Sequence, residues 1–309
     1  MKNISITVLF ITMMVVMVNF PGCGGRKTLT DSTPQQLFEE GKNKYDAEKY
    51  TRAIEYFQAI VYNYPGENIV DTAQYYLALS YFGDKEFELA QVEFNRLVVN
   101  YPSSVYFTHA IFMKAVSYYE NTPKHYGLDQ SDLKTAIKQF NDFLLDYPES
   151  ELIDEAKSYL LIAQSRMAQK FYTNATVYKR MGATQSAEIY YQKVLDDYID
   201  TDYAPSAAFG LAEIKFKRRL YDEAVEKLSD FLIVYPDHIL KEEVVKLKEE
   251  ASFKSAEQAF NENNTEAKIK LESFKKEYPE SEKISKVDEY LIQLENRPVV
   301  EPEIESENS

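Results

Sequence analysis

The sequence predicts an all-α fold built from repeated helix–turn–helix units, and three observations support that prediction. Only 9 of the 309 residues are glycine, which leaves little material for the tight turns of a β architecture. A tyrosine followed by a proline recurs after several helix-favouring runs. An alanine stands twelve residues before each of these prolines, so that one short pattern returns along the chain.

The Tyr-Pro pairs predict where helices end, because proline cannot continue the hydrogen-bond ladder of an α-helix. A sixth site carries isoleucine in place of proline. The successive spacings are 37, 46, 51, 37 and 43 residues, which indicate a period of about 34 residues with insertions. The six sites are Tyr64-Pro65, Tyr101-Pro102, Tyr147-Pro148, Tyr198-Ile199, Tyr235-Pro236 and Tyr278-Pro279.

The alanines predict close helix crossings, because each has a large apolar residue four places later on the same helix face. Alanine is needed where two helices cross too closely for a longer side chain, and its large neighbour fills the adjoining gap. The preceding helix has a small residue of its own, Gly41 in the first unit and Ala78 in the second. The six pairs are Ala53 and Phe57, Ala90 and Phe94, Ala136 and Phe140, Ala187 and Tyr191, Ala224 and Leu228, and Ala267 and Leu271.

This pattern resembles the tetratricopeptide repeat, in which each helix pair buries its apolar face only against the next pair. We therefore expect a tetratricopeptide superhelix, or α-solenoid, of five to six units. Five units occupy residues 34–236, with an insertion between Tyr119 and Asp132, and an additional C-terminal helical unit occupies residues 237–296. Residues 297–309 are acidic and contain proline, which predicts a disordered tail. An unrelated helical bundle would not explain why an alanine, a large apolar residue and a helix stop recur together six times.

Residues 1–22 predict a secretory signal peptide, because one lysine precedes an apolar stretch that ends near a small residue, Gly22. The segment resembles a bacterial lipoprotein signal, which implies cleavage before Cys23 and lipidation of that residue. Residues 23–33 would then form a tether. Phe20 and Pro21 depart from the usual lipoprotein pattern, and an uncleaved membrane helix is the alternative.

The charge and the single cysteine exclude several other classes of function. A net charge of −15 disfavours nucleic acid and anionic lipid surfaces, so anything that holds this chain at a membrane has to be hydrophobic. The three histidines, His109, His125 and His238, lie far apart in the sequence, and no catalytic, phosphate-binding or metal-binding motif is present. We therefore expect no enzyme activity, no cofactor and no metal.

The combination of signal, repeats and insertion resembles the BamD family, the lipoproteins of the outer-membrane β-barrel assembly machinery. The resemblance covers roughly residues 33–236. Departures from the family pattern are Phe171, Ile199 and the chain beyond Asp237. The matching residues are Asp129-Gln130-Ser131-Asp132, Ala136, Phe140 and Tyr147-Pro148-Glu149-Ser150 in the third unit, and Met167-Ala168, Ala175, Tyr178, Gly182, Ala187 and Val194-Leu195-Asp196-Asp197-Tyr198 in the fourth.

A groove lined by the first helices of the first three units is the candidate binding site. An aromatic lining with one lysine suits an extended peptide, and each of these aromatic residues could equally serve helix packing. The expected groove residues are Phe38, Lys42, Tyr45, Tyr75, Leu79, Phe82, Phe112, Val116 and Tyr119.

The family resemblance implies a lipid-anchored position at the periplasmic face of the outer membrane; by analogy with lipoprotein sorting, Gly24 after the cysteine points there too. It also implies two partners, unfolded outer-membrane proteins in the groove and a BamA-like barrel-forming assembly subunit at the C-terminal units. A periplasmic adaptor that coordinates envelope constriction or peptidoglycan synthesis is the main alternative, and co-purified partners would discriminate the two. A nutrient-uptake lipoprotein is less favoured, because the chain has no tryptophan.

Overall fold

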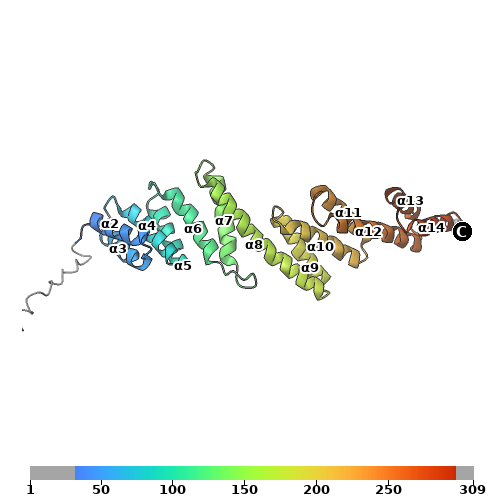
Figure 1. Ribbon diagram of the computed structural model, residues 1–309, viewed down its shortest axis with the longest axis horizontal. Coiled ribbons are helices and arrows are strands. Elements are labelled where there is room, and N and C mark those ends of the chain that lie inside the picture. Colours follow the sequence, from blue (N-terminus) through green and yellow to red (C-terminus); the bar gives the residue numbers. More distant parts are fainter. Residues whose placement is uncertain (1–31, 297–309) are drawn as a thin grey trace, which may run out of the picture. The chain divides into compact units, whose positions relative to one another are not determined.

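The computed structural model describes residues 32–296, which form 13 α-helices and contain no strand. Figure 1 shows the helices in their order along the chain. They belong to two compact units that divide between Asn121 and Thr122. Cys23, the signal peptide, the tether up to residue 31 and the predicted tail lie outside the described residues. The proposed division into residues 34–236 and 237–296 stays a prediction.

The first unit contains five helices, each of which packs against the next along the chain. Helix α2 also contacts α4, so the first helices of successive pairs meet directly, as expected for stacked helix pairs. The helices are α2 (Pro34–Asp46), α3 (Tyr50–Asn63), α4 (Val70–Gly83), α5 (Phe87–Asn100) and α6 (Phe107–Asn121).

The second unit repeats this arrangement, with consecutive helices packed together and further contacts from α8 to α10 and from α10 to α12. Its last helix, α14, has no counterpart among the helices that the sequence patterns predict. The helices are α7 (Ser131–Asp146), α8 (Ile153–Arg180), α9 (Thr184–Asp197), α10 (Tyr203–Lys217), α11 (Tyr221–Val234), α12 (Lys241–Asn261), α13 (Ala267–Glu277) and α14 (Ile284–Glu295).

The tyrosines of the five Tyr-Pro pairs and of Tyr198-Ile199, called the stop tyrosines below, each end a helix with the same backbone geometry. Each tyrosine N–H donates to the carbonyl four residues earlier at 2.8–3.0 Å, and each tyrosine carbonyl accepts from the N–H three residues later at 3.0–3.2 Å. Tyr198 keeps both hydrogen bonds although Ile199 follows it in place of proline. Proline therefore reinforces this turn, and the turn forms without it.

The turns inside five helix pairs share a different geometry, in which one residue adopts a left-handed backbone. These residues are Glu48, Lys85, Gly182, Arg219 and Asn263, with φ between 55° and 78°. The residue after each donates its N–H to the carbonyl five residues earlier at 2.8–3.0 Å, which closes a Schellman motif. Four of the five are not glycine, although this backbone disfavours side chains, so the packing of the helix pair imposes the turn.

Small residues stand wherever the two helices of a pair cross closely. The six predicted alanines and their large partners are at most 1% exposed. A Cβ atom added to Gly41 would lie 2.9 Å from Cε1 of Phe57, which is closer than real Cβ contacts allow. Five buried small residues stand twelve positions before one of these alanines, namely Gly41, Ala78, Ala175, Ala212 and Ser255. The described residues thus have the predicted all-α tetratricopeptide fold.

A carboxylate joins the last helix to the rest of the second unit. Glu257 of α12 accepts hydrogen bonds from Lys254 at 2.7 Å, from Lys286 of α14 at 2.6 Å and from the Tyr290 hydroxyl of α14 at 3.0 Å. Burial alone would raise the pKa of Glu257, but these hydrogen bonds outweigh it and lower the pKa to about 2. The ionised carboxylate therefore stabilises the contact between α12 and α14.

We expect Ala90→Leu to lower the free energy of unfolding by about 1–3 kcal/mol, because the fully buried Ala90 site has no room for a larger side chain. Chemical denaturation followed by circular dichroism measures the change. Val92→Leu is the matched control on the same helix, since Val92 is 46% exposed, and it should stay within about 0.5 kcal/mol of the parent. An Ala90→Leu variant as stable as the parent would contradict the packing argument.

We expect Glu257 to stabilise the fold at neutral pH and to lose that effect in acid. Its pKa falls from the ordinary 4.5 to about 2 on folding, so its contribution is present above about pH 4.5 and disappears as the pH falls toward 2. Unfolding of Glu257→Gln should accordingly depend less on pH in this window than unfolding of the parent. The exposed Glu272→Gln variant controls for the loss of a charge. If the free energy of unfolding changed with pH as steeply in Glu257→Gln as in the parent, the assignment would be refuted.

Candidate functional site

The nine predicted groove residues all lie on the first helices of the first unit, three each on α2, α4 and α6. They differ in how much surface they offer to a ligand. Tyr75, Phe112 and Val116 are only 9%, 3% and 2% exposed, so they offer almost no surface to a ligand. The remaining six are partly exposed, and they are Phe38, Lys42, Tyr45, Leu79, Phe82 and Tyr119.

Tyr76, which the sequence patterns did not single out, occupies the centre of the junction between α2 and α4. Its ring meets Phe38 edge-on at 5.6 Å and Tyr45 edge-on at 5.5 Å between centroids. It also stacks on the buried Phe57 of α3 at 5.7 Å. These contacts place the α2 part of the predicted groove around a single ring from the next helix pair.

Lys42 is held above this aromatic cluster. Its Nζ atom lies 5.4 Å from the Tyr76 ring centre and 5.8 Å from that of Tyr45, within the range of cation–π attraction. The same ammonium pairs with Asp46 one turn later on α2. Because the side chains of Lys42 and Asp46 are 34% and 54% exposed, this pair contributes little stability.

A second aromatic pair lies where α4 meets the start of α6. The rings of Tyr75 and Tyr106 stack at 4.4 Å with an angle of 12° between their planes. Burial, followed by the neighbouring Tyr45, raises the pKa of Tyr75 to about 12. Tyr75 is therefore a neutral phenol at physiological pH, and its ring packs as an apolar group where α4 meets the start of α6.

Among residues 32–121 of this unit, one carboxylate is strongly buried, and it has a structural role. Glu93 of α5 is 5% exposed, and it accepts hydrogen bonds from Gln74 Nε2 at 2.7 Å and from Arg96 Nη1 at 2.8 Å. Gln74 comes from α4, so the network ties the two helices of one pair. A buried charge satisfied in this way is a packing element and does not resemble an acid–base catalyst.

Residues 122–130, which form most of the insertion inside the third predicted unit, are a loop of the second compact unit. Gln130 is 3% exposed, and its Nε2 donates to the carbonyls of Pro123 at 3.0 Å, Asp129 at 3.2 Å and His125 at 3.3 Å. Arg166 of α8 donates to the Pro123 carbonyl at 3.1 Å. One side chain thus organises the loop from within, and α8 holds it from outside.

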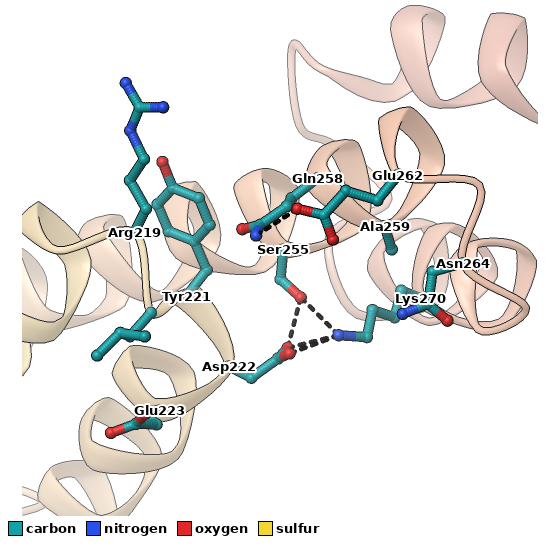
Figure 2. Close-up of a pocket in the computed structure, with 11 residues that line it drawn as sticks. Arg219, Tyr221, Asp222, Glu223, Ser255, Gln258, Ala259, Glu262, Asn264 and Lys270 are labelled. Atoms are coloured by element: carbon teal, nitrogen blue, oxygen red, sulfur yellow. Dashed lines mark hydrogen bonds and ion pairs between the residues drawn. The ribbon is translucent and has the colours of Figure 1, made fainter.

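A polar pocket of about 210 Å³ lies between α11, α12 and α13 in the second unit (Figure 2). Lys270 Nζ donates to the carboxylate of Asp222 at 2.6 Å and to Ser255 Oγ at 3.0 Å. Burial would raise the pKa of Asp222, but the hydrogen bonds from Lys270 and Ser255 hold it below its ordinary value. The triad links three successive helices, and its charges are already paired.

Two further features bear on the class of function. No group of three or more histidine, cysteine, aspartate or glutamate side chains within residues 32–296 is arranged to hold a metal ion. None of the helices in that same range is both long and apolar enough to cross a membrane.

Comparison with known proteins identifies the family. A family model described as an outer membrane lipoprotein, YfiO, matches residues 30–214, and a tetratricopeptide repeat model matches residues 250–281. The outer membrane protein assembly factor BamD of Rickettsia prowazekii is 25% identical over 236 residues, which cover 75% of this chain and 93% of that protein. BamD of Caulobacter vibrioides is 22% identical over 219 residues, which cover 69% and 72% of the two chains.

Solved structures with some similarity include a tetratricopeptide protein of Bacteroides fragilis, with a TM-score of 0.37 and 14% identity over 85% of this chain and 98% of that chain. The family assignment rests on the sequence matches. Because the outer membrane lipoprotein model spans more than half of the sequence and the relatives named above are all BamD assembly factors, this chain belongs to the YfiO/BamD family of outer membrane lipoproteins.

Proposed function

We propose that this protein is a lipid-anchored scaffold at the periplasmic face of the outer membrane, where it binds unfolded outer-membrane proteins and a barrel-forming assembly subunit. In this proposal the protein binds its partners and catalyses no reaction. Its relatives are named outer membrane protein assembly factors, and its fold is one of stacked helix pairs, which provide extended binding surfaces. The observation that carries the proposal is the cluster of aromatic rings formed by Phe38, Tyr45 and Tyr76 in the first unit, with the Lys42 ammonium above it.

The proposed ligand of this groove is the C-terminal strand of a β-barrel protein. Such a strand places alternate side chains on opposite faces, so aromatic residues on one face meet the rings of Phe38, Tyr45 and Tyr76. Its terminal carboxylate then takes the place of Asp46 beside Lys42, in a charge-assisted hydrogen bond. The unfolded chain is thereby held by its end while the rest remains free to fold.

The proposed anchor is the lipid on Cys23, which lies outside the described residues. Several acyl chains hold a protein firmly at a bilayer, whereas a single chain gives only marginal binding. Attachment confines the groove to a thin layer beneath the membrane, which raises its effective concentration near incoming barrel proteins and near the assembly subunit. A net charge of −15 gives the chain no electrostatic means of staying there.

We expect Cys23→Ser to release the protein from the membrane, because the substitution removes the proposed acylated thiol. Membrane and soluble fractions of cells that produce the parent or the variant are compared by immunoblotting. Ser32→Ala, a substitution of similar size in the tether, should leave the protein in the membrane fraction. A Cys23→Ser protein that stays with the membrane would contradict lipid anchoring.

We expect Lys42 to recognise a free C-terminal carboxylate. Fluorescence anisotropy is used with a peptide of alternating aromatic and polar residues, prepared with either a free or an amidated C-terminus. The parent should bind the free acid about tenfold or more tightly, as a hydrogen bond to a charged group contributes about 1.5–3 kcal/mol.

Lys42→Met should bind both peptides with similar affinity. Lys44→Met is the matched control, because Lys44 loses the same charge on the same helix and pairs only at 3.9 Å with Glu40. An unchanged preference for the free acid in Lys42→Met would show that the groove does not use this residue.

A further inference from the structure

An apolar pocket of about 170 Å³ lies in the second unit, between α9, α10 and α11. Its floor contains Leu211 and Phe231, which are 2% and 1% exposed. Its walls include Ile199 and Val234, which are 53% and 56% exposed. Large aliphatic side chains are thus presented to solvent beside an opening that leads to the core.

Both wall residues are exceptions to the repeat. The residue after the stop tyrosine is proline in the other five units, and only the fourth unit carries isoleucine, at position 199. The residue before the stop tyrosine is polar in the other five units, as Asn63, Asn100, Asp146, Asp197 and Glu277, and only the fifth unit carries valine, at position 234. Ile199 and Val234 therefore depart from the repeat independently, at positions where the fold does not require it, and both line the same pocket.

The volume of the pocket indicates the size of its occupant. Small-molecule sites usually enclose about 300–1,000 Å³, which exceeds this pocket. A cavity of about 150 Å³ in another protein accommodates benzene. The pocket therefore fits one large apolar side chain, such as leucine or phenylalanine, and is too small for a drug-sized ligand.

The charges around the pocket indicate what lies beside that side chain. Lys227 is the only cation among the lining residues, and it is paired with Glu226 at 3.1 Å and with Asp230 at 3.6 Å. Asp230 itself lines the pocket, and the lining Gln192 donates its Nε2 to the carboxylate of Asp196 at 2.8 Å, so a further acidic side chain lies beside the rim. The net charge of the rim is therefore negative, which favours a basic partner and disfavours a second copy of this acidic chain.

We propose that this pocket docks a segment of another protein that inserts one large apolar side chain between Ile199 and Val234 and carries lysine or arginine on either side of it. The proposal rests on the function proposed above, because the pocket lies in the C-terminal units that the family resemblance assigns to an assembly subunit. It uses no residue of the aromatic cluster around Lys42, so its test can fail while the proposal for the groove stands. Burial of the partner's apolar side chain in the pocket supplies affinity, because that side chain is removed from water. The basic residues on either side of it orient the partner against the acidic rim and speed association.

The test uses a short fluorescent peptide with both ends capped, a central leucine, lysines on either side and serines elsewhere. Binding to the full chain is followed by anisotropy at fixed ionic strength. Replacing the leucine by alanine should weaken binding about ten- to hundredfold, as expected for the burial of one large apolar side chain. Replacing the lysines by glutamates should abolish measurable binding.

The protein variants restore the residues of the other repeats, so the fold is preserved. Val234→Asn gives α11 the residue found before the stop in two other units, and it should weaken binding of the leucine peptide at least about tenfold. Ile233→Asn is the matched control, because Ile233 is 77% exposed and does not line the pocket; its affinity should equal that of the parent.

Several results would overturn the proposal. They are equal affinity of the parent and Val234→Asn, equal affinity of the leucine and alanine peptides, or equally tight binding of the glutamate peptide. Sedimentation that reveals a dimer lost in Val234→Asn would assign the surface to a second copy of the chain and would equally overturn it.

Discussion

The close crossing of two helices at paired small residues is the constraint on which the rest of this structure depends. Where Gly41 meets Phe57, an added Cβ would lie at 2.9 Å, and at Gly210 it would lie 2.6 Å from Cζ of Tyr191. Such contacts let the backbones of neighbouring helices approach closely, so the buried large residues fill a thin, regular core. The outer faces of the first helices are then free to form a binding surface.

Packing overrides local sequence preferences at several positions. Glu48, Lys85, Arg219 and Asn263 adopt a left-handed backbone that glycine would adopt more easily, and Ile199 follows a stop that elsewhere uses proline. Helix α2 begins with a capping box made by Thr33 and Gln36, whereas α3, α5 and α9 begin without any side-chain cap. Stability therefore comes mainly from stacking one helix pair on the next.

The fold could be predicted from the sequence because the residues that pack the helix pairs, and those that end them, recur at fixed spacings. Twelve positions separate the two small residues of most helix pairs, and the Tyr-Pro stops mark each second helix. Helix α14 was not predicted because no Tyr-Pro stop follows it, although apolar residues recur along it at helical spacing, among them Val287, Tyr290 and Leu294. The boundary at Asn121 is likewise a property of tertiary contacts, which no local pattern records.

The groove itself stays a prediction, and the structure shows only where its candidate residues lie. Phe38 and Lys42 are on a first helix, as the helical spacing predicts, but spacing does not reveal how deeply the neighbouring helix covers a side chain. Phe112 is therefore nearly inaccessible, and Tyr76 lies at the centre of the junction although it is adjacent in sequence to the predicted Tyr75. Those differences depend on the angle and offset between helix pairs, which the sequence does not show.

The account joins a repeat scaffold to two proposed binding surfaces of different chemistry, the aromatic cluster beside Lys42 in the first unit and a small apolar pocket in the second. Hydrogen–deuterium exchange of the full chain, with and without the C-terminal strand peptide of an outer-membrane β-barrel protein, tests its central claim most directly. The account predicts slower exchange in α2 and α4 when the peptide is bound and unchanged exchange in α9 and α11. Protection that appears only in the second unit, or no protection at saturating peptide, would contradict it.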